Sequence, residues 1–161
     1  MSDDVKVVTT LRQRATRSAM PVHASMPAAA QYDAVIATYT GTPCPVAAGI
    51  RKEIDTKVRA YVAQDARAGR PSPDALTVDA ALEKLVAARG RCLYCRCRVR
   101  VFYAEVRDPT QWTLDRVDND KPHHAANVVL SCLGCNLARR RTIHAKFLMA
   151  KRLKLEKTGR G

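Results

Sequence analysis

Residues 127–136 are Asn-Val-Val-Leu-Ser-Cys-Leu-Gly-Cys-Asn, and the Cys-x2-Cys pair in this stretch decides how the fold is interpreted. A second pair of the same spacing lies upstream, where residues 92–95 are Cys-Leu-Tyr-Cys. Two such pairs can present four thiolates in a tetrahedron around zinc, which is the usual arrangement of a structural zinc site. The spacing therefore predicts one structural Zn²⁺ ion bound by Cys92, Cys95, Cys132 and Cys135.

The chain has six cysteines, and the remaining two are expected to lie outside this site. Cys97 follows Cys95 by two residues, and an extended chain would turn its side chain away from the ion. Cys44 is far away in a Pro-rich segment. Two unrelated pairs of buried or redox cysteines are the alternative interpretation of the pattern.

The residues before the first pair predict a helical N-terminal half. Apolar residues recur at helical spacing from Gly49 until residues 69–71, which are Gly-Arg-Pro and end the first predicted helix. A second helix is expected after Thr77 as N-cap, with Gly90 as its stop. The two helices should pack together and form a lead-in over residues 49–90. Residues 1–48 show no sustained period and are predicted to be a flexible or irregular arm.

After the first pair the pattern changes to short strands. Residues 98–106 alternate around β-branched and aromatic side chains, so we expect a strand there that forms a hairpin with residues 111–115. A third apolar run at residues 128–130 leads into the second pair, and a helix should start near Asn136. A basic helix or tail is expected over residues 148–161. The predicted fold class is α+β.

Positive charge is concentrated at the C-terminus. The chain has 28 Lys and Arg against 15 Asp and Glu, a net charge of +13, and residues 139–161 contribute nine of these cations against one Glu. Such a block suits a polyanion, because each neutralised phosphate releases counterions. A nucleic acid, DNA or RNA, is the expected partner; a solvated helix that only improves solubility is the alternative. The expected contacts are Arg139, Arg140, Arg141, Lys146, Lys151, Arg152 and Lys154.

The length of 161 residues suggests one domain and excludes a large multidomain enzyme. The longest uncharged runs are broken by Pro and Gly and are too polar to cross a bilayer, so no membrane partner is expected. Without a secretory signal, the chain is predicted to be intracellular, in the cytoplasm or nucleus of a host cell, or in a virion or nucleoprotein if its source is viral.

Between the two cysteine pairs lies a second motif. Residues 113–120 are Thr-Leu-Asp-Arg-Val-Asp-Asn-Asp, followed by His123, His124 and Asn127, and Asn136 comes directly after the last cysteine. This order resembles the HNH endonuclease family, the ββα-metal nucleases in their zinc-knuckle form, and particularly the variants of phages and large DNA viruses. The resemblance covers roughly residues 90–147. It implies a zinc-stapled, treble-clef-like ββα-metal module over residues 91–147.

The resemblance also implies an activity, which is metal-dependent hydrolysis of phosphodiester bonds in DNA. Asp115 and Asn136 match the family's ligands for a catalytic Mg²⁺ or Mn²⁺ ion, and oxygen donors of this kind suit a hard cation. Asn127 matches the middle Asn, whose usual task is to bond backbone groups and hold the loop. The alternative for Asp115 and Asn136 is capping and turn duty, since Asn136 is well placed to N-cap its helix.

Arg116 departs from the family's motif, which has a general-base His directly after the Asp. Arginine stays protonated at neutral pH, so Arg116 is expected to contact phosphate or to stabilise charge in the transition state. The base would then come from His123 or His124 in the following loop. Asp118 is a further candidate, either as an additional metal ligand or as a carboxylate that orients water.

Two functions from different classes remain open. The leading hypothesis is an HNH-type endonuclease, favoured because Asp115, Asn127 and Asn136 occur together. The alternative is a catalytically inactive HNH-fold module that binds nucleic acid or serves as a structural component of a nucleoprotein, and Arg116 favours it. A zinc-dependent transcription factor is a weaker third hypothesis, because no separate recognition helix is evident.

Overall fold

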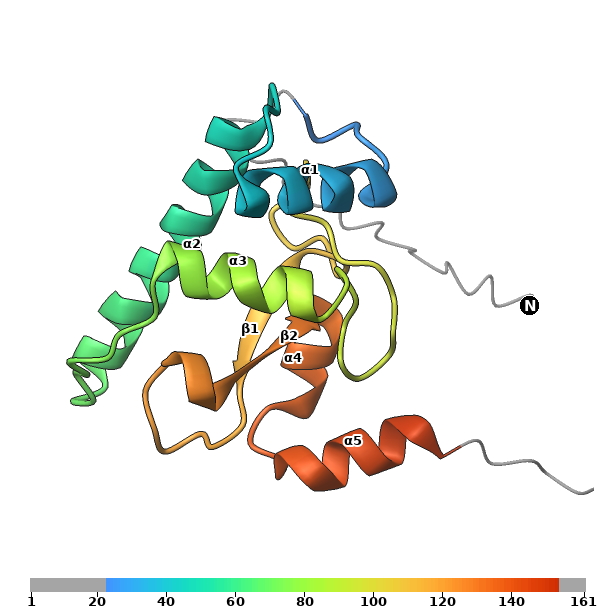
Figure 1. Ribbon diagram of the computed structural model, residues 1–161. Coiled ribbons are helices and arrows are strands. Elements are labelled where there is room, and N and C mark those ends of the chain that lie inside the picture. The colour runs from blue at the N-terminus through green and yellow to red at the C-terminus, as the bar shows by residue number, and fades with distance from the viewer. Residues whose placement is uncertain (1–22, 154–161) are drawn as a thin grey trace, which may run out of the picture.

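A computed structural model of the chain describes residues 23–153, in which five α-helices and a two-stranded sheet confirm the expected α+β class (Figure 1). Three helices come first, and the two strands, α4 and α5 follow them. The elements are α1 (Ala28–Thr40), α2 (Ala47–Arg67), α3 (Val78–Ala87), β1 (Trp112–Arg116), a 3-10 turn (Ala125–Asn127), β2 (Val128–Cys132), α4 (Leu133–Arg139) and α5 (His144–Arg152).

The two helices expected before the first cysteine pair are present as α2 and α3. The N-cap predicted for α3 is confirmed, because the Thr77 hydroxyl accepts a hydrogen bond from the Ala80 N–H at 3.1 Å. The apolar stripes of both helices enter one core, where Ile54 of α2 and Leu82 of α3 have no exposed surface. Helical periodicity was therefore a sound guide wherever the inward-facing residues are apolar.

Helix α1 corrects the prediction that residues 1–48 form an irregular arm, which is wrong for Ala28–Thr40. Two of its four buried positions are polar, namely Gln31 and Thr38, so an apolar period is hard to see in the sequence. The Gln31 amide replaces apolar packing with hydrogen bonds: its Oε1 accepts from the backbone N–H groups of Val101 and Phe102 at 2.8 and 2.9 Å. Residues 1–22 of the expected arm lie outside the described residues.

The strand expected over residues 98–106 is also corrected. Between residues 23 and 153 this segment forms only isolated bridges, from Arg98 to Arg91 and from Arg100 to Gln111. The N–H groups of Val101 and Phe102 are bonded by the Gln31 side chain, as described above, so they are not available for a ladder with a neighbouring strand.

The sheet instead pairs β1 with β2 in antiparallel register. Trp112 lies opposite Cys132, and Asp115 lies opposite Val129. Helix α4 follows β2 directly, so the two strands and this helix make a small ββα-like element (Figure 1). The cysteine pair at residues 132–135 therefore joins the end of β2 to the first turn of α4.

Helix α2 is fixed along β1 by two hydrogen bonds between side chain and backbone. The ammonium of Lys57 donates to the Trp112 carbonyl, and the Leu114 N–H donates to the Tyr61 hydroxyl at 3.0 Å. The next turn of α2 carries Asp65, which thereby lies beside the chain that leaves β1. None of the helices described is long and apolar enough to span a bilayer.

Candidate functional site

The two cysteine pairs come together in space. The sulfur atoms of Cys92, Cys95, Cys132 and Cys135 all lie within 4.8 Å of one another, so the cluster could form a zinc site. The first pair lies in a tight turn in which the Arg96 N–H donates to the Cys92 carbonyl at 3.0 Å. The second pair is held by the start of α4, where the Cys132 sulfur accepts the Cys135 N–H at 3.4 Å.

The electrostatics of the cluster favour a bound cation. A hydrogen bond from the Cys132 thiol lowers the pKa of Cys92 to about 4, whereas burial raises the pKa of Cys135 to about 12. One thiolate therefore forms readily, and the crowding of the sulfurs opposes the formation of further thiolates. Four thiolates can share this volume only around a positive ion, which supplies the missing charge.

Cys97 and Cys44 lie outside the group of four, as expected. The reason offered for Cys97 is wrong, because the chain after Cys95 is not extended. Arg96 has a left-handed backbone with φ of 64°, which turns the chain back so that the Cys97 carbonyl accepts the Cys92 N–H at 2.9 Å. Burial raises the pKa of the Cys97 thiol to about 11, and that thiol interacts with Cys95.

A second feature is a small polar cavity of about 130 Å³ between α2, β1, the following loop and α4. Four of the residues predicted to take part in catalysis line this cavity: Asp115, Arg116, His123 and Asn136. The remaining lining residues are Tyr61, Gln64, Leu114, Asn119 and Arg140. The fold thus collects residues from four separate segments at one hollow.

Asp115 lies in the wall of the cavity with only 5% of its surface exposed. Arg139 donates to it twice, from Nε to Oδ2 at 2.6 Å and from Nη2 to Oδ1 at 2.8 Å. The Tyr94 hydroxyl donates to Oδ2 at 2.6 Å. A carboxylate offers about four lone-pair sites, so these three donors, the ones found in the described part of the chain, leave one site, on Oδ1.

Arg139 corrects the prediction that this residue contacts nucleic acid. It is 1% exposed, and besides Asp115 its guanidinium donates to the Thr142 carbonyl at 2.6 Å and to Asn119 Oδ1 at 2.8 Å. A count of charges along the chain cannot show which cation faces inward. The expected contacts that are exposed are Arg140, Arg141, Lys146, Lys151 and Arg152, and Lys154 lies outside the described residues.

Asn136 lies within α4 and not at its start. Cys132 is the N-cap, so the capping role considered for Asn136 is not the one observed. Asn136 Nδ2 donates to Thr113 Oγ1 at 3.1 Å, and the Thr113 hydroxyl donates its own proton to the Ser131 carbonyl. This chain of donors fixes the amide, and among residues 23–153 no hydrogen bond engages its oxygen.

Asn127 makes the backbone hydrogen bonds that were expected of it. Its Oδ1 accepts the Asp118 N–H at 2.9 Å, and its Nδ2 donates to the carbonyls of Asp118 and Pro122, each at 3.0 Å. These bonds close the loop between β1 and β2. The loop in turn carries His123, so Asn127 acts at a distance from the cavity.

His123 is buried and held in one orientation. It is 5% exposed, its Nδ1 lies 3.0 Å from both carboxylate oxygens of Asp65, and its backbone N–H donates to Asp65 Oδ2 at 2.6 Å. The ring stacks on Tyr61 with centroids 4.5 Å apart. Within residues 23–153, no hydrogen bond engages the other ring nitrogen, Nε2. Burial is the main cause that lowers the pKa of this imidazole.

Arg116 and the other candidate residues are placed differently. Arg116 lines the cavity, where its Nη1 donates to the Lys121 carbonyl at 3.3 Å and lies 3.8 Å from Asp65. His124 is not among the residues that line the cavity. Asp118 lines a separate outer hollow and pairs with Lys121 at 3.4 Å. Of the candidate bases, His123 alone is among the lining residues.

Two contributors to this site were not predicted from the sequence. Asp65 continues the buried stripe of α2, since it follows Val58 and Tyr61 at helical spacing, and a carboxylate in that position was the available signal. Tyr94 lies between the cysteines of the first pair, and no pattern in the sequence indicates that its hydroxyl reaches Asp115.

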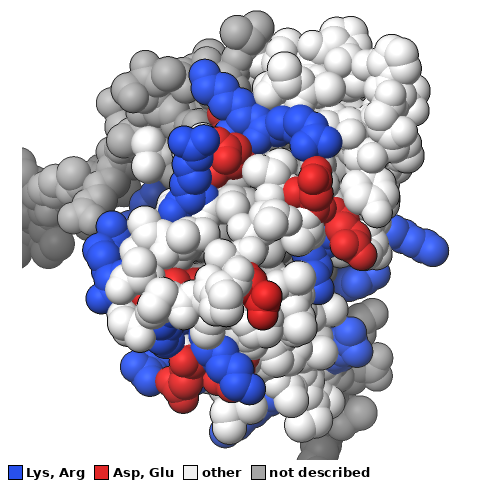
Figure 2. Space-filling model, turned by 60° about the vertical axis from the view of Figure 1, so that its left-hand side comes forward, with Lys and Arg blue, Asp and Glu red and all other residues white. Residues whose placement is uncertain are grey.

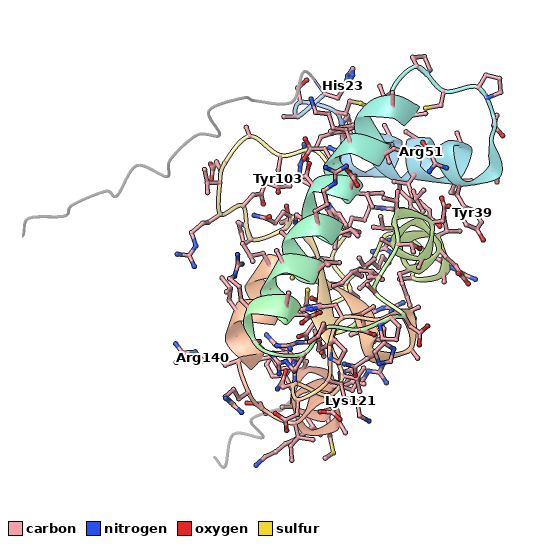
Figure 3. All side chains as sticks on the ribbon, turned by 90° about the vertical axis from the view of Figure 1, so that its left-hand side faces the viewer. His23, Tyr39, Arg51, Tyr103, Lys121 and Arg140 are labelled. Carbon is pink, nitrogen blue, oxygen red and sulfur yellow. The ribbon has the colours of Figure 1, made fainter. Side chains whose placement is uncertain are left out.

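On the side of the molecule that carries α2, the exposed charges do not form one basic face. Figure 2 shows Lys and Arg interspersed with Asp and Glu on the side of the molecule that carries α2. In Figure 3, Lys121 and Arg140 lie toward the end at which α2 terminates, and Arg140 points away from the body of the protein. His23 and Tyr39 lie at the opposite end. Because Arg140 lines the cavity, the cavity lies toward the end of the molecule that carries these two cations.

Comparison of the chain with protein-family models, with curated proteins and with solved structures found no match.

Proposed function

We propose that this protein is a metal-dependent endonuclease of the HNH type that hydrolyses phosphodiester bonds in DNA. The observation that supports the proposal is the polar cavity, which is lined by Asp115, Arg116, His123 and Asn136 together. A carboxylate, an amide oxygen, a cation and an imidazole with a free nitrogen are the groups that such a hydrolysis requires.

We also propose that the four-cysteine cluster holds a structural zinc ion. The support is the close approach of four sulfurs and the chemistry of the donor set, since tetrahedral sites built from four cysteine thiolates are typical of structural zinc. The cluster links the turn at residues 92–95 to the junction of β2 and α4. It thereby fixes Tyr94, whose hydroxyl donates to Asp115.

The residues of the cavity suit a catalytic Mg²⁺ or Mn²⁺ ion. The free site on Asp115 Oδ1 and the amide oxygen of Asn136 are hard oxygen donors. When bound, such an ion supplies positive charge at the scissile phosphate. His123 would accept a proton from the attacking water at Nε2, and Arg116 and Arg140 would bind phosphate oxygens.

A second candidate function is supported by the environment of Asp115. Its carboxylate is bonded by Arg139 and Tyr94 as tightly as in a purely structural ion pair. Together with Arg116 at the position of the usual base, this favours an inactive module that binds nucleic acid. The two functions differ in whether the cavity supports chemistry.

Plasmid cleavage tests the proposed function. Purified protein with supercoiled plasmid and Mg²⁺ or Mn²⁺ is expected to nick DNA, and His123→Ala should slow cleavage by about 10²- to 10⁴-fold through loss of the base. Asn136→Ala should slow it by removing an oxygen donor. Asp79→Asn changes an exposed carboxylate of α3 that pairs with Arg51 of α2; it is the control and should leave the rate unchanged.

The outcomes separate the two functions. A parent protein that binds DNA but cleaves it with neither cation would replace the endonuclease by the inactive module. A loss of cleavage in His124→Ala, with His123→Ala unaffected, would retain the enzyme and move the base outside the cavity. Asp115→Ala is a poor probe, because it would leave Arg139 as an unpaired buried charge.

The exposed cations of the C-terminal region predict a strong dependence of DNA affinity on salt. Replacement of Arg140, Arg141 and Lys146 by Gln should reduce the slope of log K against log salt by about 0.9 for each phosphate that the variant no longer neutralises. Binding titrations at several salt concentrations measure this slope. A control with the same change in charge replaces Lys52, Arg59 and Arg107, which are exposed elsewhere. Equal slopes in both triple variants would contradict a specific basic surface.

A further inference from the structure

We propose that Asp65 is a positioning residue for the hydrolysis, holding His123 in the tautomer in which Nδ1 carries the proton and Nε2 is the basic nitrogen facing the cavity. The inference rests on the proposed function and assigns to α2, outside the segment that resembles the HNH family, a part in the chemistry. It starts from an aspartate whose side chain is 6% exposed.

The geometry of the pair sets the tautomer. The backbone N–H of His123 can only donate, so Asp65 Oδ2 accepts at 2.6 Å. A carboxylate is an acceptor, and therefore the imidazole Nδ1 at 3.0 Å must be the donor. In the neutral ring the remaining nitrogen, Nε2, then keeps its lone pair. The cavity is the place where that lone pair can meet a water molecule or a substrate.

The ring is also held against rotation. Tyr61 stacks on it at an interplanar angle of 19°, and the Tyr61 hydroxyl is itself fixed by the Leu114 N–H of β1. The pair Asp65–His123 thus connects α2 to the loop that follows β1. A base must keep its geometry to within a fraction of an ångström, and this arrangement provides that restraint.

Burial favours the neutral form of His123. It is the largest influence on the imidazole pKa and lowers it, the hydrogen bond and the charge of Asp65 raise that pKa, and the charges of Arg116 and Arg70 lower it by smaller amounts. Arg116 lies 3.8 Å from Asp65, and Arg70 is held nearby by a bond to the Asn119 carbonyl. The stacked Tyr61 hydroxyl has its pKa raised by burial to about 12 and stays uncharged. The imidazole is therefore available as a base at neutral pH.

If Asp65 only anchored the loop to α2, it would not need its hydrogen bond to the imidazole ring. The backbone N–H bond alone would hold the loop to α2, and the second bond to the ring would add only fixation of the tautomer. The distinction can be measured with Asp65→Asn. In that variant the amide oxygen can still accept the backbone N–H, while the NH₂ that takes the place of Oδ1 can only donate to Nδ1, which favours the proton on Nε2.

The experiment combines NMR of the histidine ring with cleavage kinetics. The ring ¹⁵N shifts of His123 in the parent should show a protonated Nδ1 and a bare Nε2, and Asp65→Asn should reverse them. Cleavage should fall by about 10²- to 10⁴-fold, as expected when a base is held in the wrong tautomer. Asp55→Asn, a carboxylate on the outer face of the same helix paired with Arg59, is the control and should change neither quantity.

The rate of the parent should rise with pH as His123 loses its proton and then level off, with the midpoint below the usual imidazole value of about 6.5. The same midpoint should appear in the NMR titration of His123, which requires no variant.

A parent ring protonated at Nε2 would overturn the proposal whatever the activity. A reversed tautomer in Asp65→Asn with an unchanged rate would overturn it and leave the nuclease standing. A parent with the expected tautomer but no cleavage would overturn the proposed function and reduce Asp65 to an anchor.

Discussion

Replacement of Cys132 by serine is expected to abolish cooperative folding of the region from residue 91 to residue 139. Cys132 ends β2, caps α4 and contributes one of four clustered sulfurs, so it lies where the sheet, the helix and the ion would meet. Structural zinc contributes about 10–16 kcal/mol of apparent binding free energy, which is as large as the whole stability of a typical domain. The remaining apolar contacts are not expected to compensate for this loss.

Elemental analysis and thermal unfolding test this expectation. The parent should contain one zinc ion per chain, and a strong chelator should produce the same loss of structure as Cys132→Ser. Cys44→Ser is the matched control, because Cys44 is a half-buried thiol outside the cluster and its replacement should cause only a small change in Tm. A parent free of zinc, or a Cys132→Ser variant that melts like the parent, would contradict the prediction.

The cysteine cluster and the polar cavity are coupled through the side chain of Tyr94. Tyr94 lies between two cysteines of the cluster and donates to Asp115 at 2.6 Å. Its hydroxyl is also 3.0 Å from Nδ1 of His144 at the start of α5. Loss of the ion should therefore disturb the Asp115 carboxylate even if α1, α2 and α3 stay folded.

The parts predicted correctly from the sequence are those with a chemically specific spacing. The group of four cysteines follows from two Cys-x2-Cys pairs, and α2 and α3 follow from apolar residues at helical spacing. The first pattern is typical of zinc sites and the second of helices with one buried face, so each predicts a specific local structure. Helix α1 was not predicted from the same apolar spacing, because Gln31 and Thr38 occupy two of its buried positions and make hydrogen bonds there in place of apolar contacts.

The parts that were missed depend on long-range contacts. Gln31 lies about 70 residues from the backbone groups that it binds, and this contact removed the strand expected over residues 98–106. Asp65 and His123 are 58 residues apart. A single sequence shows that a carboxylate interrupts an apolar stripe, but it does not show which partner makes its burial tolerable. For the same reason, the inward direction of Arg139 could not be read from a basic run.

The buried pair of Asp115 and Arg139 gives the second large prediction. Arg139→Met is expected to lower the free energy of unfolding by about 3–5 kcal/mol, because it leaves a carboxylate in a desolvated wall with Tyr94 as its remaining donor. The variant also loses the bonds that tie the end of α4 to Asn119 and Thr142. Urea unfolding at neutral pH measures the loss.

A matched control shows that burial, and not the charge itself, causes the effect. Arg59→Met removes an arginine from an ion pair with Asp55 in which the Arg59 side chain is 80% exposed, and exposed pairs contribute at most about 1 kcal/mol. If both variants lost the same small amount, Asp115 would be solvated, and its carboxylate would be free to bind an ion without competition. The double variant Asp115→Asn/Arg139→Met should lose less than the sum of its single changes, because removing both charges leaves neither buried without its partner.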